Sequence, residues 1–292
     1  MSTRENKGSG RKRSVRSGAS AGRKASGRQG GNFRRKSYSR GNAPVPKKAH
    51  GPEGTPGLIR LNRFIANAGI CSRREADTFI AAGSVTVNGK TVTEMGYKVQ
   101  PTDEVRFDGR LLRQERKEYV LLNKPKNFIT TTKDEKGRRT VMELISRASN
   151  ARLVPVGRLD RNTTGLLLFT NDGDLAKKLT HPKHGVRKIY HVELDTNFKA
   201  EHLKQVREGL TLEDGPIAVD AVDYIDGGSK REVGIQIHSG RNRIVRRIFE
   251  HLGYEVVRLD RVVFAGLTKK DLPRGHWRHL TPQEVINLGM LK

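Results

Sequence analysis

The sequence predicts an α+β fold whose largely antiparallel, mixed sheet is flanked by helices. Two observations support this class. Apolar residues recur at helical spacing in some segments of residues 58–292 and alternate at strand spacing in others. These segments also lack the regular strand–helix–strand order that a doubly wound parallel sheet requires. The pattern divides the chain into residues 1–57, 58–117 and 118–292.

Residues 1–57 contain 15 Lys/Arg and only 2 Glu, which is about half of the formal net charge of +26. Their larger apolar residues are few and scattered. Such a segment cannot bury enough surface to offset the entropy of ordering, so we expect a disordered basic tail. The tail and the body are both strongly basic. This favours a nucleic acid as partner over a surface that is charged only for solubility.

Cysteine usage and the lack of long apolar segments exclude several classes of protein. Cys71 is the only cysteine, so an internal disulfide and a cysteine-based zinc site are excluded. The pairs His181/His184 and His276/His279 have no supporting carboxylate cluster, and we expect no metal site. The sequence shows no apolar leader or membrane-length segment. We therefore expect a cytoplasmic protein.

Residues 58–117 predict two short helices followed by a hairpin. Leu61, Phe64 and Ile65 share a helical face that ends at Gly69. Ser-Arg-Arg-Glu from Ser72 forms a capping box for the second helix. Asn88-Gly89 lies between valine-rich segments, which is a strong signal for a tight hairpin.

This module has a basic side, formed by Arg60, Arg63, Arg73, Arg74 and Lys90. The segments NRFIANAGICSRREA and VTVNGK resemble the S4-like RNA-binding domain. The resemblance implies that these basic residues contact RNA. A small dimerisation or packing module is the alternative.

Residues 118–292 predict further strands and helices in mixed order. The expected strands are YVLLNK, LVPV, GLLLFTN, RKIYHVEL, GIQI and the segment after Asp260. The expected helices are DGDLAKKLTH, which Asp172 opens, NRIVRRIFEHLG, and a last helix that begins with a Thr281-Pro282-Gln283-Glu284 capping box.

Asp160 stands at the end of a predicted strand, between Arg158 and Arg161. Nearby cations favour an ionised carboxylate, which can act as a nucleophile or simply pair with an arginine. The local pattern favours the structural ion pair. The same four residues, Arg-Leu-Asp-Arg, recur at 258–261. That copy continues into an apolar strand, whereas Asp160 continues into a polar Asn-Thr-Thr loop, so Asp160 is the better candidate for a reactive acid.

The longer segment GRLDRNTTGLLLFTNDGDLAKKLTHP resembles the signature of RNA pseudouridine synthases of the RsuA/RluB type. KIYHVEL, SGRNRIVRRIFEHLGYEV and LPRGHWRHLTPQE resemble later segments of that family in the same order. The resemblance spans about residues 58–292. It implies an S4-like RNA-binding domain followed by a pseudouridine synthase domain, and no cofactor, because the reaction involves no redox change.

The resemblance also assigns roles. It implies that Asp160 is the nucleophile, that Tyr190 stacks against a flipped-out uracil, and that Arg246 forms an ion pair with Asp160. Residues expected to contact the substrate are Arg158, Arg161, Arg241 and Arg243, with Leu267 as an apolar wall.

These features predict an enzyme that isomerises specific uridines of ribosomal RNA to pseudouridine. The similarity favours large-subunit 23S RNA, either free or within a ribosomal subunit precursor, and a monomeric protein. Two alternatives stay open: the same chemistry on small-subunit 16S RNA, and a non-catalytic RNA-binding or ribosome-assembly factor.

Overall fold

A computed structural model describes residues 57–291 of the chain. The basic tail predicted for residues 1–57 lies outside this range, except for Gly57. Among residues 57–291, no helix has the length and apolar content that a membrane crossing requires.

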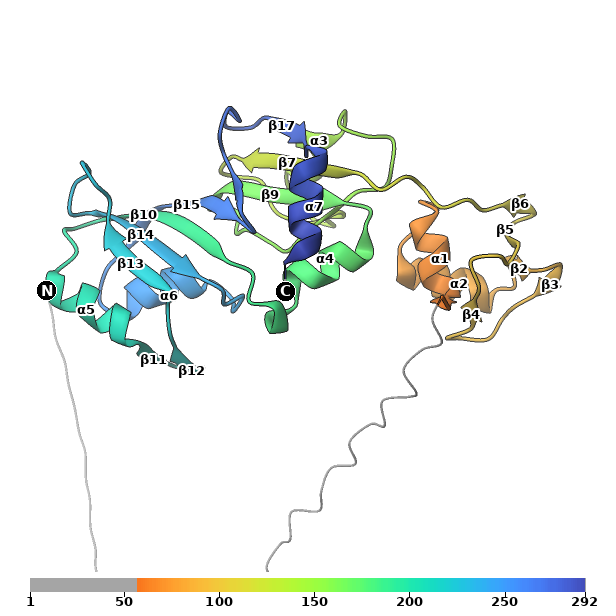
Figure 1. Cartoon of the computed structure of the whole chain (residues 1–292), viewed down its shortest axis with the longest axis horizontal. Helices are drawn as coiled ribbons and strands as arrows, with labels where there is room; N and C mark the ends of the chain where they lie inside the picture. Colours follow the sequence, from red (N-terminus) through yellow and green to blue (C-terminus); the bar gives the residue numbers. More distant parts are fainter. Residues whose placement is uncertain (1–56, 292) are drawn as a thin grey trace, which may run out of the picture. The chain divides into compact units, whose positions relative to one another are not determined.

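The first folded module contains two helices and small antiparallel sheets (Figure 1). Strands β3-β2-β5-β6 form one sheet, and β1 pairs with β4. The buried side chains of α1 and α2 pack with the valines of β2 and β5 in one apolar cluster. The elements are β1 (Ile59–Arg60), α1 (Leu61–Asn67), α2 (Arg73–Ala81), β2 (Val85–Val87), β3 (Lys90–Thr91), β4 (Lys98–Val99), β5 (Val105–Phe107) and β6 (Arg110–Leu111).

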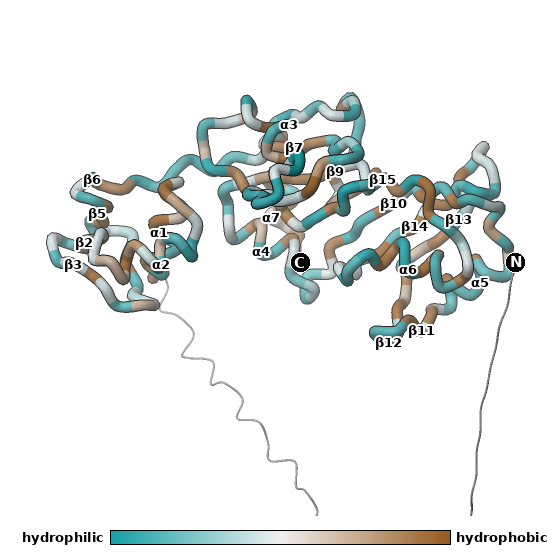
Figure 2. The backbone as a smooth tube through the Cα atoms, turned by 180° about the vertical axis from the view of Figure 1, so that it is seen from behind, coloured by the Kyte–Doolittle hydropathy of each residue, from teal (hydrophilic) through white to brown (hydrophobic). Residues whose placement is uncertain are grey.

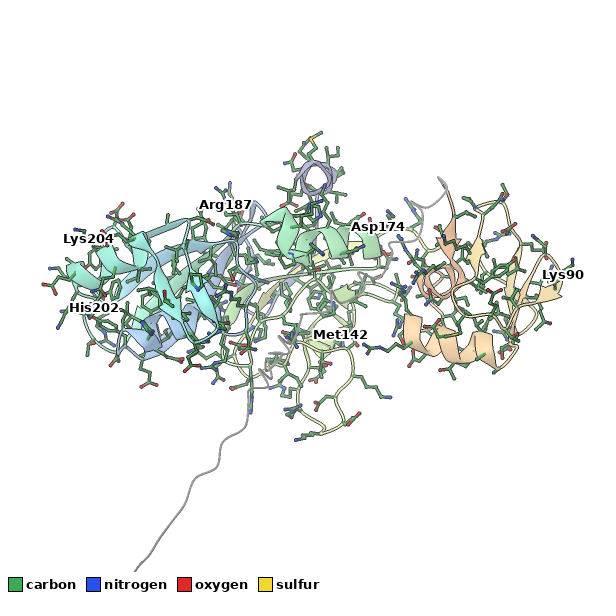
Figure 3. All side chains as sticks on the ribbon, turned by 90° about the horizontal axis from the view of Figure 1, so that it is seen from below. Lys90, Met142, Asp174, Arg187, His202 and Lys204 are labelled. Carbon is green, nitrogen blue, oxygen red and sulfur yellow. The ribbon has the colours of Figure 1, made fainter. Side chains whose placement is uncertain are left out.

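Two local predictions for this module are confirmed. Ser72 and Glu75 form the capping box at the start of α2. Asn88 and Gly89 both have positive φ, +50° and +79°, and they connect β2 to β3. That conformation belongs to the tight hairpin turn that an Asn-Gly pair favours. Lys90 follows this turn and points outward into solvent (Figure 3).

The second part of the chain is built around one large sheet. Its strands follow the order β13-β14-β10-β15-β9-β7-β17, with β8 paired to β9 and β16 to β15. The elements are β7 (Tyr119–Lys124), α3 (Val141–Ile145), β8 (Val154–Pro155), β9 (Thr164–Thr170), α4 (Gly173–Thr180), η1 (Pro182–His184), β10 (Lys188–Leu194), α5 (Ala200–Glu208), β11 (Leu210–Leu212), β12 (Gly215–Ile217), β13 (Ala221–Tyr224), β14 (Glu232–Ile237), α6 (Ile244–His251), β15 (Val256–Phe264), β16 (Leu267–Thr268), β17 (Trp277–His279) and α7 (Pro282–Met290).

Helices cover both faces of this sheet, so its central strands are apolar on both sides. In β9, Leu166 and Leu168 pack with α4 and α7, while Leu167 and Phe169 pack in the cluster that includes α3, α5 and α6. Figure 1 shows α7 lying across β7 and β9. Figure 2 shows hydrophobic colour concentrated in central strands such as β9 and β14, and hydrophilic colour in many of the connecting loops. The uninterrupted Leu-Leu-Leu-Phe sequence therefore reflects burial on two faces.

The helix starts at Asp172 and Thr281 are also confirmed. The Asp172 side chain accepts hydrogen bonds from the amides of Asp174 and Leu175, and Thr281 forms a complete capping box with Glu284. By contrast, the sequence analysis did not predict α3, α5 or the β11–β12 hairpin. Only Leu203 and Val206 are buried on α5, so its periodic signal is weak.

The sheet is largely antiparallel, as predicted, but β9 and β15 pair in parallel at its centre. Arg261 lies opposite Gly165 in this pair and opposite Tyr190 in the neighbouring pair of β15 with β10. Gly165 has φ +106°, and a Cβ atom there would lie 2.3 Å from the carbonyl oxygen of Arg261. Only glycine permits this approach of the two backbones.

Replacing Gly165 with alanine should therefore destabilise the fold by at least about 3 kcal/mol, because the new methyl group collides with backbone that cannot rotate away. Urea unfolding measures the change. Gly289→Ala in α7 is the matched control, since nothing lies within 4 Å of the added atom and φ is not positive. It should be neutral or slightly stabilising. Equal stability of the two variants would show that the close approach is not a constraint.

Candidate active site

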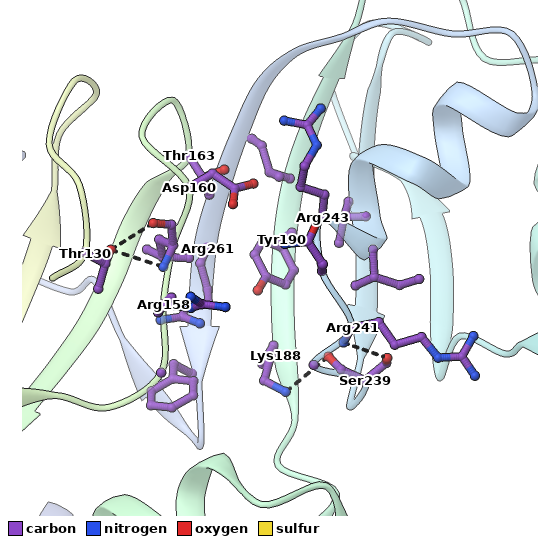
Figure 4. Close-up of a pocket in the computed structure, with 18 of the residues that line it drawn as sticks. Thr130, Arg158, Asp160, Thr163, Lys188, Tyr190, Ser239, Arg241, Arg243 and Arg261 are labelled. Atoms are coloured by element: carbon purple, nitrogen blue, oxygen red, sulfur yellow. Dashed lines mark hydrogen bonds between the residues drawn. The ribbon is translucent and has the colours of Figure 1, made fainter. Parts of the chain in front are cut away.

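A cavity of about 470 Å³ opens beside the loop that carries Asp160. This volume lies within the roughly 300–1,000 Å³ of ordinary ligand sites. Asp160 and Tyr190 both line it, and Figure 4 shows the Asp160 carboxylate directed toward the space next to the Tyr190 ring. Of the residues that line the cavity, Asp160 is the only acid, while six are Lys or Arg.

The backbone of the Asp160 loop is held in place by Lys124 at the end of β7. This lysine is fully buried, and its Nζ lies 2.8–3.2 Å from the carbonyl oxygens of Pro125, Asp160, Arg161 and Thr163. An ammonium has three donor protons, so one of these four contacts is shared.

Burial lowers the pKa of Lys124 to about 8, although the charge of Asp160 raises it and the charge of Arg274 lowers it further. The ammonium therefore still carries its charge at neutral pH, and its hydrogen bonds to the loop carbonyls are charge-assisted.

Thr130 fixes the other side of the loop. Its hydroxyl donates to the carbonyl of Leu159 at 2.8 Å and accepts from the amide of Leu159 at 3.2 Å (Figure 4). With Lys124, this contact sets the backbone on both sides of Asp160. The loop is therefore held without any bond to the carboxylate itself.

The Asp160 carboxylate forms no hydrogen bond and no ion pair within 4 Å among residues 57–291. The ion pair with a flanking arginine that the local sequence favoured is absent there. Arg158 and Arg161 are both exposed. A partly exposed carboxylate without a partner, in a cavity rich in cations, is available to a ligand.

Asp260, in the second Arg-Leu-Asp-Arg copy, is bound on every side. Its carboxylate pairs with Lys269, accepts from Arg274 at 2.9 Å, and accepts from the Thr164 hydroxyl at 2.8 Å. Burial by itself would raise the pKa of Asp260, but these hydrogen bonds lower it to about 2. In one copy of the tetrapeptide, the carboxylate of Asp160 is therefore unpaired, whereas in the other copy the ionised carboxylate of Asp260 is paired with cations.

Tyr190 lies on β10 and is 8% exposed. It is part of the apolar cluster beneath α6 and also lines the cavity. One face of the sheet thus places an aromatic side chain beside Asp160 in the same cavity.

Arg246 lies on α6, where its Nη1 donates to the carbonyl of Val256 at 2.8 Å. Burial lowers its pKa, the charge of Arg243 lowers it further, and the charge of Asp160 raises it. The expected ion pair between Arg246 and Asp160 is absent from the described structure, and Arg246 does not line the cavity. Asp160 acts on Arg246 only through the longer-range field, and the role of Arg246 stays a prediction.

The remaining predicted contacts fall into two groups. Arg158, Arg161, Arg241 and Arg243 are exposed and line the cavity, whereas Leu267 is buried among apolar side chains elsewhere and does not line it. In the first module, Arg60, Arg73, Arg74 and Lys90 are exposed and Arg63 is partly buried. Leu267 belongs to the apolar cluster that contains Leu288 of α7, and its Cα pairs with that of Phe264, which does line the cavity.

Two family models match the chain, and several known proteins are similar to it. The family model described as RNA pseudouridylate synthase matches residues 118–251, and the S4 domain model matches residues 59–105. The chain is 41% identical over 237 residues to the Bacillus subtilis ribosomal large subunit pseudouridine synthase B, covering 80% of this chain and 97% of that protein. The chain belongs to the RNA pseudouridylate synthase family.

Two further proteins are similar to this chain. The Yersinia pestis ribosomal large subunit pseudouridine synthase B is 39% identical over 230 residues, covering 76% of this chain and 72% of that protein. A crystal structure of a pseudouridylate synthase is 30% identical with a TM-score of 0.58, covering 79% of this chain and 99% of the other.

Sequence reasoning missed several residues that form the site of this synthase. Lys124 was treated only as the last residue of the expected strand YVLLNK, although a lysine at the end of an otherwise apolar strand is a signal of a buried charge. Lys188 precedes Tyr190 by two residues and so shares its face of β10. Arg261 was given no role, and no local pattern shows that it lies opposite Tyr190.

The pairing of Asp260 predicts that Asp260→Asn lowers stability at pH 7 by about 1–2 kcal/mol, after allowance for solvent screening. The folded-state pKa lies below the unfolded value of 3.8, so the contribution is complete above about pH 4 and is lost as the pH falls toward 2. Urea unfolding between pH 7 and pH 3 should show the deficit of the variant shrinking below pH 4. A deficit that does not change over this range would rule out the carboxylate as its cause.

The position of Lys124 predicts that Lys124→Met slows pseudouridine formation by at least about 100-fold, with RNA affinity changed less than about threefold. The reason is that loop carbonyls lose their donors and Asp160 loses its fixed position. Single-turnover rates and filter binding measure the two quantities. Lys126→Met, at an exposed neighbouring position, is the control. Full activity of Lys124→Met would mean that the Asp160 loop keeps its conformation without the hydrogen bonds from Lys124.

Proposed function

We propose that the protein isomerises specific uridines of large-subunit ribosomal RNA to pseudouridine, with Asp160 as the nucleophile. One observation carries the assignment of the nucleophile: Asp160 is the only acid lining the cavity, and its carboxylate is unpaired among the described residues. The choice of ribosomal RNA, and of the large subunit, is supported by the names of the similar proteins from Bacillus subtilis and Yersinia pestis.

In the proposed reaction, the target uridine leaves its stack and its base lies against Tyr190. Unstacking costs a few kcal/mol, and base–aromatic stacking returns roughly 1–3 kcal/mol. Asp160 attacks the ribose at C1′, and the bond from C1′ to N1 of uracil breaks. The uracil then rotates, its C5 bonds to C1′, and carboxylate and sugar separate. The proton of C5 is lost and N1 gains one, so the product is an isomer of the substrate.

Several side chains are proposed to support this sequence of steps. Arg246 acts on Asp160 through its charge, which is close enough for the two groups to affect each other. The exposed Arg158, Arg161, Arg241 and Arg243 at the cavity contact phosphates of the RNA. Binding should therefore weaken with rising salt.

The basic residues of the first module are proposed to supply further contacts to RNA. Arg60, Arg63, Arg73, Arg74 and Lys90 are proposed to hold RNA that flanks the target, as the S4 domain match supports. The proposed organisation is a tail at 1–57, an RNA-binding domain at 58–117 and a catalytic domain at 118–292. The protein is proposed to act as a monomer in the cytoplasm, on ribosomal RNA that is either free or within a subunit precursor.

Replacing Asp160 with asparagine should reduce pseudouridine formation by at least 10⁴-fold, because an amide is no nucleophile toward C1′. Stability should change by less than about 0.5 kcal/mol, since the carboxylate has no partner to lose among residues 57–291. Chemical mapping of pseudouridine in 23S and 16S transcripts, incubated with wild type or variant, measures activity and identifies the target RNA.

Asp260→Asn is the matched control, because it removes the acid of the other Arg-Leu-Asp-Arg copy. It should retain activity wherever it remains folded. Undiminished modification by Asp160→Asn would overturn the nucleophile assignment. A wild-type protein that binds both transcripts and modifies neither would favour a non-catalytic RNA-binding factor.

A further inference from the structure

Arg261 is buried at the cavity with most of its hydrogen-bonding capacity unused. It is 3% exposed, its Nε donates to the carbonyl of Leu166 at 2.8 Å, and its guanidinium carbon lies 4.5 Å from the centre of the Phe264 ring. Neither terminal nitrogen has a hydrogen-bond partner among residues 57–291, and Nη2 is fully buried. Buried donors of a charged group are rarely left unsatisfied, so this guanidinium requires an explanation.

The position of Arg261 indicates what satisfies it. Arg261 lines the same cavity as Asp160, and its Cα is paired with that of Tyr190 across strands β15 and β10. Figure 4 shows Arg261 on one side of the cavity, beside the Tyr190 ring. Asp160, the one acid of the lining, forms no ion pair with it in the described structure. Nη2 is closed off from the cavity, so the other terminal nitrogen, Nη1, is the donor that a ligand in the cavity can reach.

Lys188 adds a second donor at this end of the cavity. Its Nζ donates to the carbonyl oxygens of His238 at 2.8 Å and Ser239 at 3.3 Å, which leaves one N–H unused. Burial and the neighbouring charge of Arg261 lower the pKa of Lys188 to about 8, against the opposing charge of Asp220, which raises it. Among the described residues, neither of these two neighbouring cations has a carboxylate within 4 Å, and both can donate hydrogen bonds but cannot accept them.

We propose that Arg261 and Lys188 form a recognition site for the carbonyl oxygens of the uracil base. This inference rests on the proposed function. Four exposed arginines at the cavity are available to bind phosphates, namely Arg158, Arg161, Arg241 and Arg243. Arg261, by contrast, is buried beside the Tyr190 ring, against which the base is proposed to stack. A site with donors alone can bind the carbonyl oxygens of uracil, which are acceptors. The amino group of cytosine is itself a donor, so it would face other donors there.

The symmetry of uracil explains how such a site tolerates the reaction. Rotation about the axis through N3 and C6 exchanges N1 with C5 and also exchanges O2 with O4. The donors that hold one carbonyl oxygen before the base rotates therefore hold the other one afterwards. Cytosine would place its amino group at these donors in one of the two orientations.

The test combines changes in the protein with changes in the RNA. The substrate is the shortest large-subunit RNA segment in which wild type forms pseudouridine, prepared with uridine, 2-thiouridine or 4-thiouridine at the target. A fourth RNA carries a methylphosphonate on the 5′ side of the target. Sulfur is a poor hydrogen-bond acceptor, and the methylphosphonate removes a phosphate charge.

With uridine, Arg261→Met and Lys188→Met should each slow single-turnover formation of pseudouridine by about 10- to 100-fold. Each thio substitution should slow wild type by about tenfold and slow Arg261→Met by less than threefold more. The methylphosphonate should have the same effect on wild type and on Arg261→Met. Arg258→Met and Arg187→Met, at exposed positions that do not line the cavity, are the matched controls and should respond to every RNA as wild type does.

The opposite pattern overturns the inference: wild type insensitive to both thio substitutions, or a methylphosphonate effect that disappears in Arg261→Met, which would assign Arg261 to a phosphate. If thermal unfolding shows that Arg261→Met is not folded, Arg261→Lys and the wild-type response to the four RNAs decide in the same way. A wild type that modifies no RNA segment overturns the proposed function as well, and that result is distinct from an active enzyme indifferent to sulfur.

Discussion

The close approach of β9 and β15 at Gly165 and Arg261 is the constraint on which the active site depends. It is a short parallel pairing in an otherwise antiparallel sheet, and a single Cβ atom at Gly165 would prevent it. On one side it fixes the end of the Asp160 loop. On the other side β15 pairs with β10, which carries Tyr190. Asp160 and Arg261, about 100 positions apart in the chain, thus share one cavity because of these two strand registers.

The two Arg-Leu-Asp-Arg segments show how tertiary surroundings assign chemistry to identical local sequences. Around Asp160, the side chains of Lys124 and Thr130 donate their hydrogen bonds to backbone carbonyl oxygens, and the carboxylate has no partner among the described residues. Around Asp260, the donors of Lys269 and Arg274 bind the carboxylate itself. A fixed backbone with an unpaired side chain is what a nucleophile requires, since partners would first have to be displaced. A fully paired carboxylate serves instead to join β9 to the segment after β15.

Sequence alone was sufficient where the determining interactions are local. The caps at Ser72, Asp172 and Thr281, the Asn88-Gly89 turn and the alternation around Tyr190 follow from neighbouring residues. Asp160 was found because its polar loop differs from the strand after Asp260. Lys124 and Lys188 left local signals that were overlooked, whereas the parallel β9–β15 pair, the position of Leu267 and the buried Arg261 could not be found in this way. They depend on contacts between distant segments, which periodicity and spacing do not encode.

The central claim is that the free carboxylate of Asp160 meets the ribose of an extruded uridine in this cavity. A structure of the protein bound to a large-subunit RNA segment that it modifies tests this most directly. The account predicts one uridine out of its stack, its C1′ within about 4 Å of an Asp160 oxygen, and its base against Tyr190. RNA that crosses the surface with every base stacked and the cavity vacant, or a flipped base whose ribose lies away from Asp160, would contradict it.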